Sequence, residues 1–508
     1  MSHAIAVLGS ASDVGKSLVA AGLGRLYRDA GLDVAPYKAQ NMANQAGVTA
    51  EGLEMPRAQI LQARACGLEP HVDMGPVLMK PVTATGAQIV LLGKAVGAME
   101  AKEYFGDTAR FRDVAFGALD RLQARHRVIV LEGAGSPVEL NLMPRDYVNL
   151  QAARHARASL VLVVDIHKGG VFAQAKGTLD LLPAEDRARV LGLVVNRFKG
   201  DAALFEDGIP MLEEICGVPV LAVLPWLDHG LDEEDRPIRI PVDAAPVPGR
   251  LNVGAVLSPR VANTEDLAPL LAEPDVHLTW LTSPDLARAQ DLLILPGSKA
   301  TVGDLAHHAA TGMAEAILDA HGRGAWVLGL CGGYQMLGET LEDPLGGEGG
   351  PSRWQGLGLL PLATSFAASK TTLERQYTSA WPEAGHALSG YEIHHGQSRA
   401  LGGQALVAEG GGELGLCADR AVGAYLHGLL QSDGWRSAFL NQVRRGRGFP
   451  ALGPQVADPL EVRLRRWADH IRAHLRPGAL EILMAAAGYL DPDASTSGSI
   501  SRSMSENG

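Results

Sequence analysis

A chain of 508 residues is too long to fold around one hydrophobic core, so its length predicts two to four domains. Its net charge of −12 excludes the basic surface that nucleic-acid binding requires, and no apolar stretch is long enough to span a bilayer. The N-terminus lacks the pattern of a signal peptide, and the four cysteines are scattered without a CxxC pair. We therefore expect a protein of the reducing cytoplasm that binds neither nucleic acid nor a membrane.

Short apolar runs alternate with helical segments in two successive series along the chain. The first series begins with AIAVLG (residues 4–9) and ends with GVPVLAVLPW (residues 217–226). The second begins with LNVGAVLS (residues 251–258) and includes SGYEIHHG before it ends with AVGAYLHG (residues 421–428). Runs this short, rich in β-branched residues and followed by helices, are typical of strands buried in a parallel sheet. The pattern predicts an α/β fold.

A change of composition separates the two series. Residues 227–250 are acidic and then proline-rich, as is typical of a linker, so we place the domain boundary near residue 245. From about Val443 the apolar residues recur at helical spacing, and the final residues hold too little apolar surface to fold. The predicted organisation is a first domain over 1–245, a second over 246–445, a helical extension over 446–488 and a disordered tail over 489–508.

The segment GSASDVGKS, residues 9–17, follows the first predicted strand directly and precedes a helix. Glycines in such a loop let backbone N–H groups point at phosphate oxygens, with the helix N-terminus behind them. Lys16 would reach the outer phosphates of a nucleotide, and the Ser17 hydroxyl would bind magnesium. Five residues rather than four separate the first glycine from the Gly-Lys pair, so this is a variant phosphate-binding loop. The predicted nucleotide-binding residues of the loop are Gly9, Asp13, Gly15, Lys16 and Ser17.

Four polar residues end other predicted strands of the first domain. Ligands gather at the carboxyl ends of parallel strands, so Glu132 and Asp165 are candidate magnesium ligands beside Ser17. Lys38 could neutralise charge on a transferring phosphoryl group, and Asn196 could bond the edge of a purine. Each has an ordinary alternative: a loop cap for the acids, a solvated side chain for the lysine, and a turn position for the asparagine.

A cysteine of the second domain stands where a nucleophile would be expected. GLCGGYQMLG, residues 329–338, places Cys331 between glycines at the point where an apolar strand gives way to a helix. A sharp turn there needs the backbone freedom of glycine, and the start of a helix favours the reactive thiolate. A buried structural cysteine is the alternative.

A thiol nucleophile needs a base and donors for an oxyanion. His427 ends an apolar strand of the same domain and is the candidate base, whereas His394 and His395 lie in a separate motif. The turn at Gly297, together with Gly332 next to the cysteine, could supply the oxyanion donors.

The motifs PGSK, GLCGGYQMLG, GYEIHHG and YLHGL occur in this order and resemble the class I glutamine amidotransferase domain of the cobyric acid synthase family, a flavodoxin-like fold. Upstream, GSASDVGKS, YKAQNM, PRAQILQA, LEGAGSPVELNL and NRFKGD resemble the ATP-dependent half of that family, which is related to dethiobiotin synthetase. The resemblance covers residues 4–475. It implies a P-loop parallel-sheet domain followed by an amidotransferase domain, each with flanking helices.

The resemblance also implies a reaction. ATP and glutamine-derived ammonia would amidate the b, d, e and g carboxylates of adenosylcobyrinic acid a,c-diamide through acyl phosphates, with Mg²⁺ and without a tightly bound prosthetic group. L-glutamine and the corrinoid are the implied partners, and the oligomeric state stays open. Cys331 resembles the glutaminase nucleophile and His427 its base. Lys38 would help to spread phosphoryl charge, and Asp146 matches a family acid near the phosphorylated carboxylate, with a helix cap as its alternative.

Class I amidotransferases usually carry a glutamate two residues after the histidine, where this chain has Leu429. The cobyric acid synthase branch likewise lacks it, so the resemblance implies a Cys–His dyad; its base should be weak, and the group that orients His427 stays open. Two positions depart from the family motifs, where Ser10 replaces a threonine and Ala43 replaces a serine. The alternatives are a cobyrinic acid a,c-diamide synthase, a ParA-like ATPase switch that would leave Cys331 and His427 without a role, and an inactive amidotransferase retained for assembly.

Overall fold

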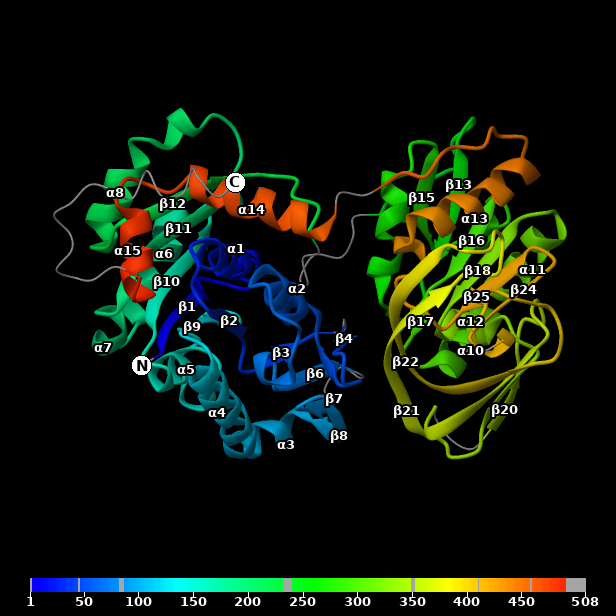
Figure 1. Cartoon of the computed structure of the whole chain (residues 1–508), viewed down its shortest axis with the longest axis horizontal. Coiled ribbons are helices and arrows are strands. Elements are labelled where there is room, and N and C mark those ends of the chain that lie inside the picture. Colours follow the sequence, from blue (N-terminus) through cyan, green and yellow to red (C-terminus); the bar gives the residue numbers. More distant parts are fainter. Residues whose placement is uncertain are drawn as a thin grey trace. The chain divides into compact units, whose positions relative to one another are not determined.

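The computed structural model describes residues 2–43, 46–81, 86–231, 240–348, 352–409, 411–456 and 459–489, and they form two compact units (Figure 1). The first unit takes its described residues from 1–49, 53–236 and 458–508, and the second takes them from 50–52 and 237–457. The chain thus leaves the first unit, builds the second and returns. The predicted extension over 446–488 is therefore divided, because its last helices bury their apolar faces in the first unit. Of the predicted tail, residues 490–508 lie outside the described residues.

The first unit is built on a parallel sheet of six strands in the order β12-β11-β10-β1-β9-β2. The strands are β1 (His3–Gly9), β2 (Val34–Tyr37), β9 (Val128–Glu132), β10 (Ser159–Asp165), β11 (Val190–Phe198) and β12 (Val220–Pro225). Alternate residues of β1 enter different cores: Ala4, Ala6 and Leu8 face one, and Ile5 and Val7 the other. Burial on both faces explains why these strands are apolar throughout, and it confirms the predicted α/β class.

Helices cover both faces of this sheet (Figure 1). One core holds side chains of α1 (Lys16–Asp29), α14 (Leu460–Ala473) and α15 (Ala479–Ala486). The other holds side chains of α4 (Thr108–Arg125), α5 (Leu150–His155), α6 (Val171–Leu181) and α8 (Gly208–Cys216). The helix α2 (Arg57–Ala65) contributes to both cores, and α3 (Ala101–Gly106) and α7 (Ala184–Arg187) are short.

A small sheet extends the first unit beside the end of β2. It contains β3 (Asn41–Met42), β6 (Val77–Pro81), β7 (Gly86–Leu91) and β8 (Lys94–Glu100), while β4 (Ala46–Val48) and β5 (Glu54–Pro56) pair with each other. No helix in the described part of the chain combines the length and apolar character needed to cross a membrane.

The second unit is built on a seven-stranded sheet in the order β15-β13-β16-β18-β25-β24-β23. Its first five strands are parallel, and at one edge β24 pairs antiparallel with both β25 and β23. The strands are β13 (Leu251–Val256), β15 (Val276–Leu281), β16 (Leu292–Leu295), β18 (Trp326–Leu330), β23 (Gln404–Ala405), β24 (Gly415–Ala418) and β25 (Ala421–Ala424). The helices are α9 (Pro284–Ala287), α10 (Thr301–Thr311), α11 (Met313–Gly322), α12 (Gly332–Met336) and α13 (Asp433–Gly446).

A second sheet in this unit has the order β20-β19-β21-β22. It contains β19 (Thr340–Asp343), β20 (Ser352–Gln355), β21 (Leu362–Thr378) and β22 (Ala387–Ala400), and a two-stranded ladder joins β14 (Val261–Ala262) to β17 (Gly297–Ser298). The segment SGYEIHHG therefore does not continue the parallel series, because it belongs to β22 and pairs with β21 in an antiparallel hairpin.

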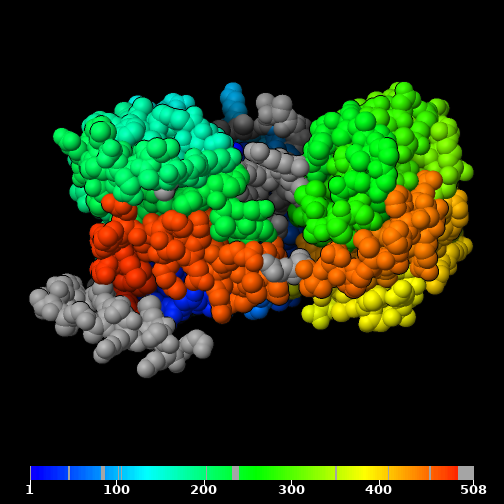
Figure 2. All heavy atoms as spheres, turned by 90° about the horizontal axis from the view of Figure 1, so that it is seen from above, coloured from blue at the N-terminus to red at the C-terminus, as the bar shows by residue number. Residues whose placement is uncertain are grey.

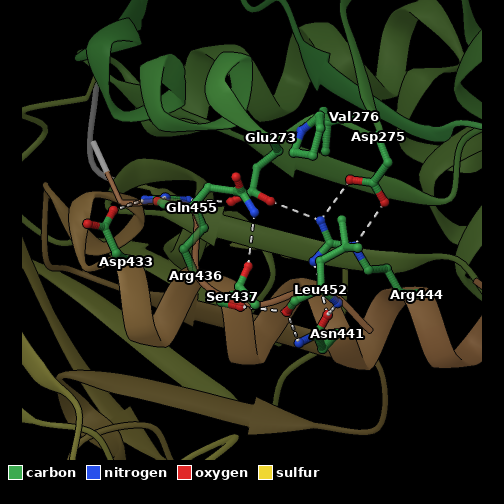
Figure 3. Close-up of polar contacts among 12 residues, drawn as sticks. Glu273, Asp275, Val276, Asp433, Arg436, Ser437, Asn441, Arg444, Leu452 and Gln455 are labelled. Atoms are coloured by element: carbon green, nitrogen blue, oxygen red, sulfur yellow. Dashed lines mark hydrogen bonds and ion pairs between the residues drawn. The ribbon is translucent and has the colours of Figure 1, made fainter. Parts of the chain in front are cut away.

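A buried group of opposite charges anchors α13 to the second unit (Figure 3). Glu273, at the end of the 3₁₀ helix η4 (Thr264–Ala272), accepts hydrogen bonds from Arg436 and Arg444, each at 2.9 Å. Arg444 also contacts Asp275 at 2.8 Å, and Arg436 donates to the Leu430 carbonyl at 2.7 Å. Because the buried charges are paired and hydrogen-bonded, the helix is fixed to both η4 and the segment that follows β25.

Candidate active sites

The phosphate-binding loop lies between β1 and α1 in the first unit. Gly15 adopts a left-handed conformation (φ 95°), and a Cβ added there would come within 2.2 Å of the Asn196 amide nitrogen, so the position requires glycine twice over. The Lys16 ammonium donates to the carbonyls of Ala11 (2.9 Å) and Gly135 (3.1 Å). The Lys16 ammonium therefore lies across the loop, close to where a phosphate bound by the backbone N–H groups would lie.

Glu132 is the centre of a buried polar network behind the loop. Its Oε1 accepts hydrogen bonds from the Ser17 hydroxyl at 2.6 Å and from Lys38 Nζ at 2.8 Å. Its Oε2 accepts from Gln62 at 2.6 Å and from Gln59 at 3.2 Å. Burial opposes ionisation, but the charge of Lys38 and these hydrogen bonds hold the pKa of the Glu132 carboxyl below its ordinary value. The carboxylate thus stays ionised, and Lys38 is buried rather than solvated.

The oxygen donors of Ser17 and Glu132 suit Mg²⁺, which prefers carboxylate and hydroxyl ligands. Asp165 is engaged elsewhere, since its Oδ2 pairs with Arg197 at 3.1 Å and its Oδ1 accepts from the His167 backbone at 2.8 Å. Across the residues that the structure describes, no cluster of three or more His, Cys, Asp or Glu side chains is arranged for a metal ion. The structure therefore brings together Ser17 and Glu132 of the predicted metal ligands, and it uses Asp165 as an ion-pair partner and loop cap.

Asn196 and Arg197 brace the phosphate loop from β11. The amide nitrogen of Asn196 donates to the Val14 carbonyl at 2.8 Å, and its oxygen accepts from the Arg197 backbone at 2.9 Å. The Arg197 side chain donates to the carbonyl of Asp13, a residue that adopts a positive φ of 64°. In this structure the predicted purine-binding amide of Asn196 therefore holds the loop itself.

Asp146 caps the turn before α5. Its carboxylate accepts from the backbone of Val148 (2.8 Å) and Asn149 (3.2 Å) and from the Asn149 side chain (2.8 Å). Asn149 in turn bonds both backbone groups of Ala134, at 3.0 and 2.7 Å, and so orders the loop that follows Glu132. This arrangement matches the capping alternative, and it shows Asp146 acting on the loop through Asn149.

Sequence reasoning assigned no role to Gln59, Gln62 or Asn149. The two glutamines are three residues apart in PRAQILQA, which places them on one face of α2, and that spacing was the available signal. Both departures from the related motifs are accommodated locally. The Ser10 hydroxyl donates to Gln174 at 3.3 Å, and Ala43 is buried with its backbone bonded to Met79.

Cys331 occupies a strained turn between β18 and α12 in the second unit. It has φ 50° and ψ −103°, and its side chain is buried, with Sγ 3.6 Å from the Ile393 carbonyl oxygen. The glycines around it are required by close approach, since a Cβ on Gly333 would lie 1.9 Å from the Leu295 carbonyl oxygen. Strained backbone of this kind clusters at active sites, so the conformation of Cys331 supports a functional role for the thiol.

His427 is held between the thiol and a carboxylate. Its Nδ1 donates to Asp266 Oδ2 at 2.7 Å, and the Gly428 backbone donates to the other carboxylate oxygen at 2.8 Å. Cys331 lies close enough to the ring to influence the pKa of His427. Burial disfavours the imidazolium, but the charges of Asp266 and Cys331 outweigh it and raise the pKa of His427 well above its ordinary value. The three side chains form a Cys–His–Asp triad.

The expected dyad with a weak base is therefore wrong. Asp266 lies in η4, and 161 residues separate it from His427. Leu429, at the position where a glutamate was expected, is fully buried in the core instead. The carboxylate that orients His427 therefore comes from η4 rather than from the residues after the histidine. The acidic pair in NTEDLAP was the available sign of it in the sequence.

The other candidate histidines are engaged by groups other than the thiol. His394 contacts Glu392 at 3.1 Å and the Gly396 carbonyl at 2.7 Å, and its ring stacks on Tyr425 at 3.7 Å. His395 contacts the Ala367 carbonyl at 3.3 Å. These contacts favour His427 as the base.

The predicted oxyanion turn lies beside the triad. A Cβ added to Gly297 would lie 3.3 Å from the His427 ring, and one added to Gly332 would lie 2.8 Å from the Ser298 backbone nitrogen. Gly332, which follows the cysteine, and the turn at Gly297 thus lie close to His427. Together they could surround one reacting group.

Two family models match the chain, one in each unit. Residues 5–238 match the CobQ/CobB/MinD/ParA nucleotide binding domain, and residues 252–435 match the CobB/CobQ-like glutamine amidotransferase domain. The chain is 45% identical over 500 residues to a cobyric acid synthase of Chlorobaculum tepidum, covering 95% of this chain and 98% of the relative. It is 43% identical over 493 residues to the cobyric acid synthases of Chlorobium phaeobacteroides (93% and 97% covered) and Klebsiella pneumoniae (94% and 97% covered).

Proposed function

Because this chain belongs to the cobyric acid synthase family, we propose that it uses ATP and glutamine to amidate the b, d, e and g carboxylates of adenosylcobyrinic acid a,c-diamide, giving adenosylcobyric acid. One observation carries the proposal: a single chain holds both a complete Cys–His–Asp triad and a phosphate loop backed by the Glu132 network. A ParA-like switch would have no use for the triad. An inactive amidotransferase would have no reason to keep it.

In the second unit the triad supplies ammonia. Cys331 gives its thiol proton to His427, and the resulting thiolate attacks the side-chain amide carbon of glutamine. The new C–S bond places negative charge on the amide oxygen, near Gly297 and Gly332. The imidazolium of His427, stabilised by Asp266, gives its proton to the leaving nitrogen, so that ammonia departs and a thioester remains. Water, deprotonated by His427, then attacks the thioester and releases glutamate and the thiol.

In the first unit the phosphate loop activates the acceptor. A substrate carboxylate oxygen attacks the γ-phosphorus of ATP, the bond to ADP breaks, and an acyl phosphate forms. Lys16 and Lys38 spread the charge of the transferring group. Ser17 and Glu132 would hold Mg²⁺, which neutralises phosphate charge when it is bound. Ammonia then attacks the acyl carbon, phosphate leaves, and loss of one proton gives the amide.

The direct test is to incubate the protein with ATP, glutamine and the a,c-diamide and to determine the masses of the corrinoid products by mass spectrometry. We expect products in which one, two, three and then four carboxyl groups have become amides, with one ADP and one glutamate released for each conversion. Parallel incubation with cobyrinic acid tests the alternative reaction. Amidation of that acid at its a and c carboxylates, with the a,c-diamide left unchanged, would show that the enzyme is the a,c-diamide synthase.

Asp266→Asn should lower the glutaminase rate by about 10³-fold or more, because His427 loses both the group that fixes its tautomer and the charge that stabilises its imidazolium. Amidation with added ammonia should be unchanged. The pH dependence of glutaminase activity gives a second readout. Asp266 raises the pKa of His427, so the imidazolium persists to higher pH. Removing that charge should move the alkaline limb of glutaminase activity to lower pH.

A second buried acid–histidine pair provides the matched control. Glu392→Gln and His394→Asn should retain substantial glutaminase activity, whereas His427→Asn should lose it and keep the ammonia-dependent reaction. An inactive His394 variant beside an active His427 variant would mean that the base is His394.

A further inference from the structure

Asp304 is a fully buried carboxyl in the first turns of α10, and the mechanism above gives it no role. Its Oδ2 accepts a hydrogen bond from the Ser298 hydroxyl at 2.6 Å, and its Oδ1 accepts one from the Arg260 backbone N–H at 3.2 Å. Burial raises the pKa of the Asp304 carboxyl above its ordinary value, although both hydrogen bonds oppose that shift. Burying a carboxyl costs free energy, so the two groups that it binds point to what it does.

Both groups belong to the ladder that contains the oxyanion turn. Ser298 ends β17, and Arg260 directly precedes β14. The two strands pair antiparallel, so that Ala262 lies opposite Gly297. One carboxyl of α10 thus binds both strands of the ladder, and it binds the residue next to Gly297.

The helix α10 holds the same part of the chain at a second point. His308 lies four residues after Asp304, on the same face of the helix, and its Nε2 is 2.9 Å from the Ser258 hydroxyl oxygen. Both His308 and Ser258 are buried. Burial lowers the pKa of His308 to about 4, so its ring is neutral near pH 7 and makes this contact without burying a charge. The loop between β13 and β14 is therefore fixed to α10 at both of its ends.

The start of α10 also contacts the helix that follows the nucleophile. The Thr301 hydroxyl donates to Gln335 Oε1 of α12 at 3.1 Å, and a Cβ added to Gly332 would lie 3.2 Å from the Thr301 hydroxyl oxygen. The helix α10 therefore bonds to the oxyanion turn on one side and to the helix that begins after Cys331 on the other.

The segment that α10 holds connects the turn to the triad. A Cβ added to Gly297 would lie 3.2 Å from the Ala262 carbonyl oxygen and 3.3 Å from the His427 ring. Shortly after β14 the chain enters η4, which carries Asp266. Glu273 fixes the end of η4 to α13, and in the second unit of Figure 2 the orange surface that includes α13 adjoins the green surface of the segments that include η4. A shift of β14 would thus displace the turn relative to His427.

We propose that Asp304 is a positioning residue of the glutaminase reaction. Through Ser298 and Arg260 it holds the turn at Gly297 where the backbone stabilises the oxyanion that forms when the thiolate attacks glutamine. The inference rests on the proposed glutaminase reaction, and it adds a residue that bonds to none of the three triad side chains in its printed contacts. The ordinary alternative is an acid that only stabilises the N-terminus of its own helix.

Asp304→Asn is the informative substitution, because it keeps the size of the side chain and an oxygen that can accept from Arg260. Its amide NH₂ then faces the Ser298 hydroxyl and cannot accept from it. We expect kcat for glutamine hydrolysis to fall by about tenfold or more, since small displacements of a reacting geometry cost up to about 10²-fold. The KM for glutamine should change by less than about twofold, and amidation with added ammonium salts should be unchanged.

Alkylation by iodoacetamide separates the turn from the triad. The Cys331 thiolate displaces iodide from carbon, so a C–S bond forms and a C–I bond breaks without an oxyanion. Asp304→Asn should be alkylated at Cys331 at the wild-type rate, followed by mass spectrometry of the peptide that contains it. Asp266→Asn should be alkylated more slowly, because His427 loses the charge that favours its ion pair with the thiolate. Alkylation of Asp304→Asn that slows as much as its glutamine hydrolysis would overturn the proposal.

Ser298→Ala removes the same hydrogen bond from its other end and should lower kcat to a similar extent. Because both substitutions act on one bond, the double variant should be no slower than the slower single variant. Losses that multiply in the double variant would contradict a shared role.

Leu305→Ala is the matched control, because Leu305 follows Asp304 on α10 and is buried in the apolar core. It should lower the melting temperature at least as much as Asp304→Asn does and keep kcat within about twofold of the wild type. A lowered melting temperature with wild-type kcat in Asp304→Asn, or an equal loss of the ammonia-dependent reaction, would overturn the positioning role and leave the glutaminase intact. Failure of the wild type to hydrolyse glutamine would overturn the proposed function itself.

Discussion

Cys331→Ala should abolish glutamine-dependent amidation and leave amidation with added ammonium salts at the wild-type rate. Removing a nucleophile that acts within a triad typically costs about 10⁴-fold or more, because the base and its carboxylate have nothing left to activate. The ammonia-dependent reaction needs only the phosphate loop and the acceptor carboxylate, to neither of which the thiol contributes. Corrinoid amide formed per minute, with each nitrogen source in turn, measures the two activities in one protein sample.

Cys417→Ala is the control for this experiment, since Cys417 is another buried, free cysteine of the second unit and lies in β24. It should keep both activities. Alanine fits poorly with a positive φ, so Cys331→Ser is a useful second variant with a similar side-chain shape. If a folded Cys331 variant lost both activities together, the thiol would be needed for more than ammonia release and its assignment as glutaminase nucleophile would be wrong.

Lys16→Ala should lose amidation from both nitrogen sources, by about 10²-fold or more. Without the ammonium group the transferring phosphoryl loses a positive partner, the acyl phosphate does not form, and ammonia has nothing to displace. Hydrolysis of glutamine at Cys331 should persist, because the triad is built entirely from residues of the other unit. ADP release, glutamate release and amide formation, measured side by side, separate the three steps.

Lys176→Ala serves as the control for charge, since Lys176 is a lysine of α6 that pairs with Asp180 at 2.7 Å on the surface of the first unit. It should behave as the wild type does. A folded Lys16→Ala protein that amidates with free ammonia at the normal rate would rule out the phosphate-loop assignment.

Local pattern was enough to predict the elements that carry the chemistry. The alternation of short apolar runs with helices predicted two α/β units, and the structure confirms that class. Gly15 and the glycines after Cys331 could be predicted as turn residues. A positive φ or a close backbone approach is a local requirement that glycine meets, and a few adjacent residues are enough to reveal it. In the same way, SGYEIHHG was correctly expected to be a strand, but its hairpin partner was not foreseen.

The amino-acid sequence alone was enough to propose the reacting groups, because the thiol, the histidine and the lysine each lie in a short motif whose neighbours shape the local backbone. Only the tertiary structure decided what surrounds them. Asp266 reaches His427 across 161 residues, and Trp467 reaches Leu18 across 449. The physical reason is that a side-chain hydrogen bond depends on where two elements pack, and packing is set by whole cores rather than by any spacing along the chain.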